Sequence, residues 1–252
     1  MQGKLVCISG ASAGIGLECA RAFARVGANL VLGARRLDRL KEIASELSAA
    51  GVKVLPLALD VTAADSVTKF ANLLREKFGS DPDIVINNAG LACGVDHLVD
   101  GQEADWQTML DTNVMGLLRF TKAFLPAMKQ RGTGHIINLG SIAGFQTYPG
   151  GAVYAGTKHA VKAINDALRM ELLGTKIRVT SLDPGLVETE FSQVRLGDKG
   201  KAKQVYQGIE PLTGKDVAEV ALFAASQPAH VNLDHIIMTP VAQASAYHVH
   251  RD

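Results

Sequence analysis

The chain has 252 residues, of which 47% are hydrophobic and 20% are charged, and its formal net charge at pH 7 is +1. This composition excludes an intrinsically disordered chain and argues against a basic nucleic-acid-binding protein. The three cysteines form no CxxC pair, so we expect neither a disulfide framework nor a metal site. Apolar runs are too short for a membrane span or a secretory signal, which predicts a cytoplasmic protein with no membrane partner.

Short apolar runs alternate with helical patterns along the chain. The expected strands cover residues 5–9, 29–32, 53–58, 84–86, 135–139, 176–182 and 234–238. The expected helices cover residues 15–26, 37–50, 63–78, 105–130, 152–173 and 216–225, and the fourth is expected to bend near Pro126. This alternation predicts one α/β domain over residues 1–252, with a doubly wound, Rossmann-like, mainly parallel seven-stranded sheet. The least regular segment, about residues 188–214, is expected to be a substrate flap or a surface loop.

A glycine-rich turn lies between the first expected strand and the first expected helix. Its glycines follow a G-x-x-x-G-x-G spacing, where Gly10 permits the tight turn and Gly14 and Gly16 permit close approach of a pyrophosphate. The start of a helix also supplies free N–H groups and a positive dipole end. The turn is therefore a candidate dinucleotide site, although an ordinary strand-to-helix turn remains the alternative. The expected contacts are Gly10, Ser12, Gly14, Ile15 and Gly16.

The end of the second expected strand indicates which dinucleotide binds. Ala34 stands where an acidic residue would hold a ribose 2′-hydroxyl, and Arg35 and Arg36 follow it. A guanidinium pairs with a 2′-phosphate, whereas an acid would repel it, so the sequence favours NADP(H) over NAD(H). Either arginine is a candidate for the main contact, and we favour Arg35. A solvated pair at the start of a helix is the alternative.

Tyr154 and Lys158 are four residues apart in an expected helix and hence share a face. A free phenol has a pKa of about 10, so it needs a nearby ammonium to act as a base at neutral pH. Ser141 follows the fifth expected strand, where a hydroxyl would face the ligand crevice beside the tyrosine. A helix cap or turn serine is the alternative for Ser141.

Taken together, these residues resemble the short-chain dehydrogenase/reductase family. The matching segments are residues 9–16, Asn87-Asn-Ala-Gly90, Asn113, Ser141, Tyr154 to Lys158 and Pro184-Gly185, in the family's order from residue 3 to about residue 240. The resemblance implies that Tyr154 exchanges a proton with the substrate and that Ser141 orients the substrate oxygen. It also implies that Lys158 lowers the tyrosine pKa and holds the nicotinamide ribose, while Asn113 anchors a proton-relaying water.

The same resemblance implies the rest of an NADP(H) site. Asp60 would contact the adenine ring, Thr189 would bind the nicotinamide carboxamide, and Asn87 would order the central strands. Turn chemistry alone is the alternative for Asp60 and Asn87. Family members are usually oligomers, which implies a homotetramer joined through residues 105–130 and 152–173. The expected cofactor contacts beyond the glycine turn are Arg35, Arg36, Asp60, Val61, Asn87, Ala89, Gly90, Tyr154, Lys158, Pro184, Gly185, Val187 and Thr189.

The substrate is less constrained than the cofactor. Residues 138–144, 184–195 and 242–252 resemble the family branch of NADP-dependent 3-hydroxy acid dehydrogenases, which includes enzymes acting on serine and L-allo-threonine. A guanidinium binds a carboxylate in a fork, so Arg195 is expected to bind the substrate carboxylate. The alternative is that Arg195 is a solvated loop arginine. The other expected substrate contacts are Ser141, Gln146 and Tyr154. The expected reaction is hydride transfer between NADP(H) and a small 3-hydroxy or 3-oxo acid.

Two other functions remain open on the sequence. A 3-oxoacyl-thioester reductase or a broad carbonyl reductase would use the same four catalytic residues with a more open or apolar pocket. A non-catalytic nucleotide-sensing protein is the remote alternative. One departure from the family pattern is visible beside the site, since Asp183 precedes Pro184 where a neutral residue is more usual.

Overall fold

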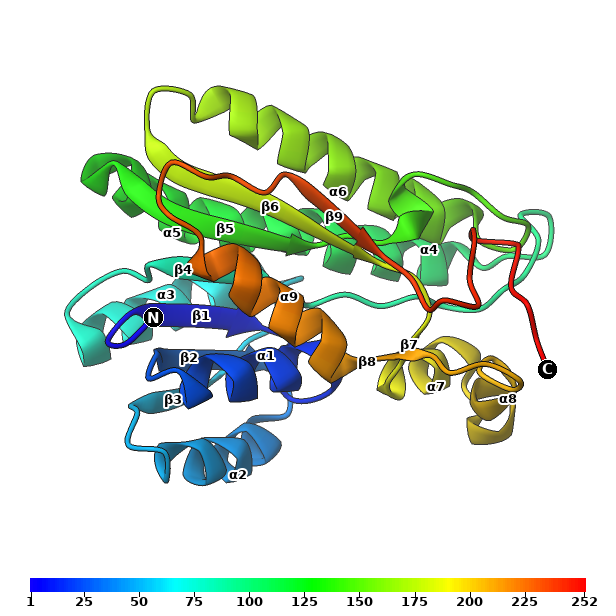
Figure 1. Ribbon diagram of the computed structural model, residues 1–252, viewed down its shortest axis with the longest axis horizontal. Coiled ribbons are helices and arrows are strands. Elements are labelled where there is room, and N and C mark those ends of the chain that lie inside the picture. Colours follow the sequence, from blue (N-terminus) through cyan, green and yellow to red (C-terminus); the bar gives the residue numbers. More distant parts are fainter.

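Seven strands form one sheet in the order β3-β2-β1-β4-β5-β6-β9, and every neighbouring pair is parallel (Figure 1). The structure is a computed structural model that describes residues 1–252. It confirms the Rossmann-like α/β fold, and the sheet is wholly rather than mainly parallel. The strands are β1 (Leu5–Ser9), β2 (Asn29–Ala34), β3 (Val54–Ala58), β4 (Ile84–Asn87), β5 (Thr133–Leu139), β6 (Lys176–Pro184) and β9 (His235–Met238).

Helices cover both faces of this sheet, which explains why the strands are apolar on both sides. In β1, Val6 and Ile8 pack in a core with α1, α2 and α9, whereas Leu5 and Cys7 pack in a second core with α3, α5 and α6. The first set is α1 (Gly14–Arg25), α2 (Leu37–Ser48) and α9 (Gly214–Ser226), and the second is α3 (Ala64–Phe78), α5 (Leu117–Arg131) and α6 (Ala152–Glu171).

The strand order reverses between β1 and β4, which places a crevice at their carboxyl ends. The pairing register aligns Ile8 with Ile86 across β1 and β4, and Leu139 with Leu182 across β5 and β6. The turns that follow β1, β4, β5 and β6 therefore open at one edge of the sheet. No helix of the structure is both long and apolar enough to cross a bilayer.

The long helix expected at residues 105–130 is interrupted, and the interruption is not at the expected place. α4 (Glu103–Leu110) passes into a π-helical turn, η1 (Asp111–Gly116), before α5 begins. Pro126 lies inside α5, which continues past it to Arg131, so the interruption is separate from the bend expected near Pro126, and that bend stays a prediction. A π-turn adds one residue to a helical turn and widens it, and it leaves little trace in hydrophobic spacing.

The segment at residues 188–214 is more regular than expected. It contains α7 (Glu190–Leu196) and α8 (Lys199–Gln204), and β7 (Val187–Glu188) pairs with β8 (Leu212–Thr213). Side chains of Thr189 and Asp198 cap the two short helices. The C-terminal tail returns to this segment, where Asp252 N–H donates to the Gly208 carbonyl at 3.1 Å (Figure 1). We refer to residues 188–214 as the flap.

Candidate active site

A cleft of about 610 Å³ opens at the carboxyl edge of the sheet, between the glycine-rich turn and the flap. It brings together most of the residues that the sequence predicted. Those that line it are Gly10, Ser12, Gly14, Ile15, Arg35, Arg36, Asp60, Val61, Ala89, Gly90, Ser141, Tyr154, Lys158, Pro184, Gly185, Val187, Thr189 and Arg195. Gly16, Asn87, Asn113 and Gln146 do not line it.

The glycine-rich turn fits a bound pyrophosphate. Gly10 and Gly14 have φ angles of 67° and 54°, which side-chain-bearing residues rarely adopt. A Cβ on Gly16 would overlap the Gly10 carbonyl, so glycine is required where α1 folds back on the turn. α1 has no side-chain cap and no acidic residue in its first turn. Its N-terminal N–H groups are thus unclaimed by any side chain and face the cleft, as an anion site requires.

The two arginines after β2 differ in their contacts. Arg36 Nε donates to Ser12 Oγ at 3.1 Å, and its Nη1 forms an ion pair with Glu190 of the flap at 3.0 Å. Arg39 pairs with the same carboxylate at 2.7 Å. Arg35 lines the cleft and forms no side-chain hydrogen bond or ion pair. No acidic side chain occupies the end of β2, so this end of the cleft is suited to a 2′-phosphate.

Tyr154 and Ser141 meet in the cleft from α6 and the end of β5. Burial raises the pKa of the Tyr154 phenol, Tyr148 adds to this rise, and the Ser141 hydroxyl and Arg195 guanidinium oppose it. Ser141 Oγ lies 3.3 Å from the Pro184 carbonyl, to which it donates, and it accepts from Ala143 N–H at 3.1 Å. The tyrosine is therefore protonated at neutral pH in this structure and is poised to donate a proton.

Lys158 is 8% exposed and lies beneath the cleft, where its Nζ donates to the Leu139 carbonyl at 2.7 Å. Burial lowers its pKa to about 8, and the Asp183 carboxylate opposes that effect. Its Nζ is 5.8 Å from the centre of the Tyr154 ring. The groups that oppose the rise in the Tyr154 pKa are Ser141 and Arg195, so the expectation that Lys158 lowers this pKa stays a prediction.

Asn113 lies behind the cleft, in the η1 turn. Its Nδ2 donates to the Leu91 carbonyl at 2.8 Å and to Thr157 Oγ1 at 3.1 Å, and its Oδ1 accepts from Leu91 N–H. Thr157 Oγ1 in turn donates to the Tyr154 carbonyl at 2.7 Å. Thr157 thus connects Asn113 to the turn of α6 that carries the tyrosine, a role that the sequence did not reveal.

Arg195 of α7 crosses the mouth of the cleft beside Tyr154. Its Nε donates to the Gly94 carbonyl at 2.9 Å, and its Nη1 donates to the Tyr148 hydroxyl at 3.0 Å. The guanidinium carbon is 5.5 Å from the ring centres of both tyrosines. Nη2 is buried without a partner. A buried guanidinium N–H₂ without a hydrogen-bond acceptor is energetically costly, and an anion is its strongest acceptor. We therefore expect an anion to bind beside Arg195.

The remaining sequence candidates have structural contacts. Gln146 Oε1 accepts from Ala246 N–H at 2.8 Å; Ala246 lines the cleft and Gln146 does not, so Gln146 contacts the C-terminal tail instead of being exposed to a substrate. Asn87 is buried and its Nδ2 donates to Thr121 and Asn138, both at 2.8 Å, as expected for a residue that orders the central strands. Tyr148 lines the cleft and accepts a hydrogen bond from Arg195, a contact that no spacing rule predicts.

Comparisons with known proteins agree with this geometry. Residues 4–199 match the family model described as short chain dehydrogenase. The chain is a member of the short-chain dehydrogenase family. It is therefore an oxidoreductase, and the resemblance drawn from its motifs is confirmed.

Several relatives span the whole chain. An NADP-dependent 3-hydroxy acid dehydrogenase of Schizosaccharomyces pombe is 46% identical over 100% of this chain and 98% of its own length. Sulfoacetaldehyde reductase 2 of Chromohalobacter salexigens is 43% identical over 98% and 99%. A solved structure described as the closed form of serine dehydrogenase complexed with NADP⁺ has a TM-score of 0.92 and 41% identity, covering 98% of this chain and 100% of that one.

Proposed function

We propose that this short-chain dehydrogenase moves a hydride between NADP(H) and a small 3-hydroxy or 3-oxo acid, with Tyr154 as general acid and base. The observation that carries the proposal is Arg195, whose buried Nη2 has no partner and whose guanidinium lies beside the Tyr154 ring. An anionic substrate would satisfy this group while its carbonyl oxygen faces the phenol.

The cleft has the donors that an NADP(H) molecule needs. The N-terminus of α1 would hold the pyrophosphate, and Arg35, with Arg36, would hold the 2′-phosphate. Thr189 of the flap packs against Gly14, since a Cβ added to Gly14 would lie 3.3 Å from the threonine Cβ. Thr189 thus forms the flap side of the cleft next to the glycine-rich turn. The bound nicotinamide supplies or accepts the hydride. The NADP-dependent 3-hydroxy acid dehydrogenase and the serine dehydrogenase complexed with NADP⁺ support the same assignment.

The chain's own groups would handle the proton. In the reducing direction, Tyr154 would donate its hydroxyl proton to the developing alkoxide of the substrate. The raised pKa of Tyr154 favours the protonated phenol before the reaction. Ser141 would turn its hydroxyl from the Pro184 carbonyl to the substrate oxygen and so polarise it. Lys158, with a pKa of about 8, would stabilise the tyrosinate that remains, and Asn113 would anchor the route by which the proton is replaced.

The charge beside the carbonyl defines the substrate class. A 3-oxo acid carries its carboxylate one methylene from the reacting carbon, and sulfoacetaldehyde carries its sulfonate at the same separation. Relatives named for both kinds of substrate match this chain over nearly its full length. Arg195 lies beside Tyr154 and could bind either the carboxylate or the sulfonate while the carbonyl faces the phenol. We therefore propose a pocket that is selective for short anionic carbonyl compounds rather than for long thioesters.

Initial rates with purified protein test this proposal. NADP⁺ and NAD⁺ are each paired with L-serine, L-allo-threonine, 3-hydroxyisobutyrate and a neutral secondary alcohol. NADP⁺-dependent oxidation of the acids, with little oxidation of the alcohol, supports the proposal. Turnover of the neutral alcohol alone would favour a broad carbonyl reductase, and cofactor binding without any turnover would favour a nucleotide sensor.

The organisation of the molecule completes the proposal. We treat residues 1–252 as one catalytic domain in which the flap closes the substrate end of the cleft. Leu110, Met115 and Leu118 are more than a third exposed along α4, η1 and α5. Such an apolar row is suited to a subunit contact, and a homotetramer is the proposed assembly. Sedimentation equilibrium would distinguish a tetramer from a dimer or monomer.

A further inference from the structure

The end of β6 carries a buried carboxylate directly behind the active site. Asp183 is 1% exposed, and its Oδ1 accepts from the Ser141 backbone N–H at 3.2 Å and from Ser181 Oγ at 2.8 Å. A Cβ on Gly140 would overlap this Oδ1, so the carboxylate packs against the backbone immediately before Ser141. A carboxylate in this position needs a counter-charge, because an unpaired buried charge costs several kcal/mol.

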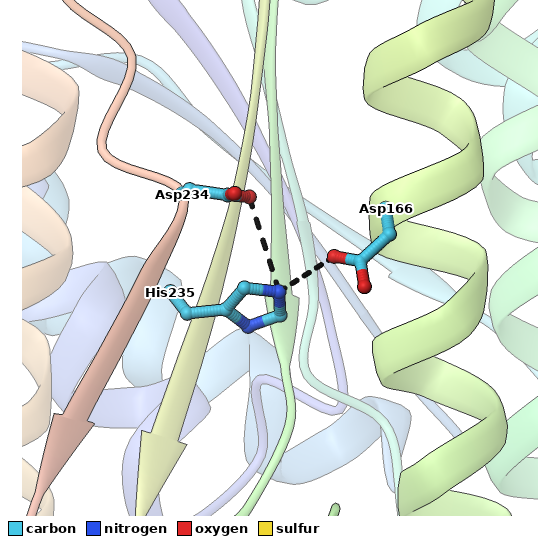
Figure 2. Close-up of side chains that lie close together, drawn as sticks. All are labelled: Asp166, Asp234 and His235. Atoms are coloured by element: carbon cyan, nitrogen blue, oxygen red, sulfur yellow. Dashed lines mark hydrogen bonds and ion pairs between the residues drawn. The ribbon is translucent and has the colours of Figure 1, made fainter.

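His235 of β9 supplies that counter-charge. Its Nδ1 is 3.1 Å from Asp183 Oδ2, and its Nε2 is 2.7 Å from Asp166 Oδ1 on α6. Figure 2 shows the imidazole between β9 and α6, with Nε2 directed at Asp166 and Asp234 placed above it at 3.9 Å. Ionised carboxylates only accept hydrogen bonds, so both ring nitrogens act as donors and the ring is an imidazolium.

The charges around this ring are balanced by residues of α6. Lys162 Nζ pairs with Asp166 at 2.8 Å, and Arg169 pairs with Asp234 at 3.0 Å. Asp166, Asp234 and His235 are close enough together to resemble a metal-ligand set, but each carboxylate already has a cationic partner. Lys162 and Arg169 thus neutralise the two carboxylates, as a bound metal ion would. Asp183 differs from these two carboxylates, because its only direct cationic partner is His235, while Lys158 and Lys162 act on it from farther away.

We propose that His235 is a positioning residue that acts through Asp183 on the active-site residues Ser141 and Lys158. Asp183 has His235 on the β9 side and Ser141 and Lys158 on the cleft side. The imidazolium offsets much of the negative charge of Asp183. The part that is not offset stabilises the Lys158 ammonium. His235, with 17% of its side chain exposed, therefore helps to set how readily Lys158 keeps its proton during the proposed reaction.

The groups that face each member support this direction of influence. Asp183 from β6, Asp166 from α6 and Asp234 just before β9 surround His235. The Phe145 ring is nearly perpendicular to the imidazole, with the two ring centres 5.4 Å apart. Burial lowers the pKa of His235, but its bonds to Asp166 and Asp183 outweigh this and hold the pKa above its ordinary value. The imidazolium therefore persists to higher pH than that of an ordinary histidine, and it is lost as the pH rises through the folded-state pKa.

Two single variants should move the alkaline limb of carbonyl reduction in opposite directions. Asp183→Asn keeps an acceptor for Ser141 N–H but removes the charge that stabilises the Lys158 ammonium, so the limb in kcat should move to lower pH by about one unit. His235→Gln removes the imidazolium that neutralises Asp183, so the carboxylate should act more strongly on Lys158 and the limb should move to higher pH. The double variant lacks the carboxylate through which His235 acts, so its limb should lie close to that of Asp183→Asn alone.

Asp234→Asn is the matched control, because it removes a carboxylate beside the same imidazole that does not contact Asp183. We expect it to leave the limb in place. Circular dichroism and NADPH fluorescence titration show whether each variant is folded and binds cofactor. A limb that stays in place in both folded single variants, or that moves the same way in both, would overturn the proposal. A purely structural network would lower the melting temperature without moving the limb.

A histidine titration of the unaltered protein covers the case in which a variant does not fold. The chain has seven histidines, and nitrogen-15 chemical shifts report the protonation of each ring. We expect one ring with both nitrogens protonated at pH 7, and a neutral His235 at that pH would refute the inference. The inference rests on the proposed function only for its kinetic readout. If the protein reduces only neutral ketones, the proposed substrate fails, whereas the limb can still be measured on those ketones.

Discussion

Replacing Arg195 with methionine isolates the charge that the proposed substrate needs. The substitution retains an unbranched side chain and removes the guanidinium that lies 5.5 Å from the centre of the Tyr154 ring. A hydrogen bond to a charged group contributes about 1.5–3 kcal/mol, so kcat/KM for a 3-hydroxy acid should fall by roughly 10- to 150-fold. The loss should appear mainly in KM, because the carboxylate is bound equally in the ground state and the transition state.

The same variant changes the tyrosine for every substrate. Arg195 holds down the pKa of Tyr154, so its removal should raise that pKa further and alter the turnover of neutral and anionic substrates alike. The informative quantity is therefore the ratio of kcat/KM for 3-hydroxyisobutyrate to that for a neutral alcohol, which should fall at least about tenfold. Both rates are measured with NADP⁺ at saturation.

Arg251→Met provides the control for this experiment. Arg251 also donates to backbone carbonyls of the flap, those of Gln207 at 2.6 Å and Val205 at 3.1 Å, but it does not line the cleft. Its loss should leave the ratio unchanged. Equal losses on acid and alcohol in Arg195→Met would refute the carboxylate role, because the guanidinium would then serve only the tyrosine or the flap.

Three further changes test other parts of the site. Arg35→Ala should raise the Kd of NADPH by about tenfold or more while leaving that of NADH nearly unchanged, as measured by fluorescence titration, and an equal change for both would exclude a 2′-phosphate contact. Gly140→Ala should destabilise the protein by about 1–3 kcal/mol in urea unfolding, since the new Cβ overlaps the Asp183 carboxylate, and full stability would contradict that packing. Thr157→Val should lower kcat while Tm falls by only a few degrees, because Asn113 Nδ2 loses one acceptor and retains Leu91; unchanged kcat would limit Thr157 to a structural role.

The parts of the molecule that the sequence predicted depend on local rules. The glycine-rich turn has to follow β1 and open α1, and each of these features has a signature within a few residues. The alternation of apolar runs and helical patterns similarly predicted six of the helices and all seven strands of the main sheet. Some boundaries differ from the expected ones by one or two residues, which reflects end effects that hydrophobic spacing does not encode.

The features that the sequence did not predict depend on contacts between distant segments. His235 and Asp183 are 52 residues apart, and His235 and Asp166 are 69 apart, so only the pairing of β6 with β9 brings them together. The tyrosine pKa depended on how deeply the fold buries the phenol, which residue spacing does not reveal. The unusual acid at Asp183 was visible in the sequence, but its partner was not.

The bridge between Glu190 and the arginines after β2 has a consequence for cofactor engineering. Glu190 follows Thr189 at the base of the flap, and it reaches across to Arg36 and Arg39 at 3.0 and 2.7 Å. Replacing Arg36 to accept a different dinucleotide would release half of this tether, and replacing both arginines would leave the carboxylate repelling any phosphate nearby. Arg36, a proposed contact of the 2′-phosphate, thus also anchors the flap, so we expect a change of cofactor at this residue to require a substitution at Glu190 as well.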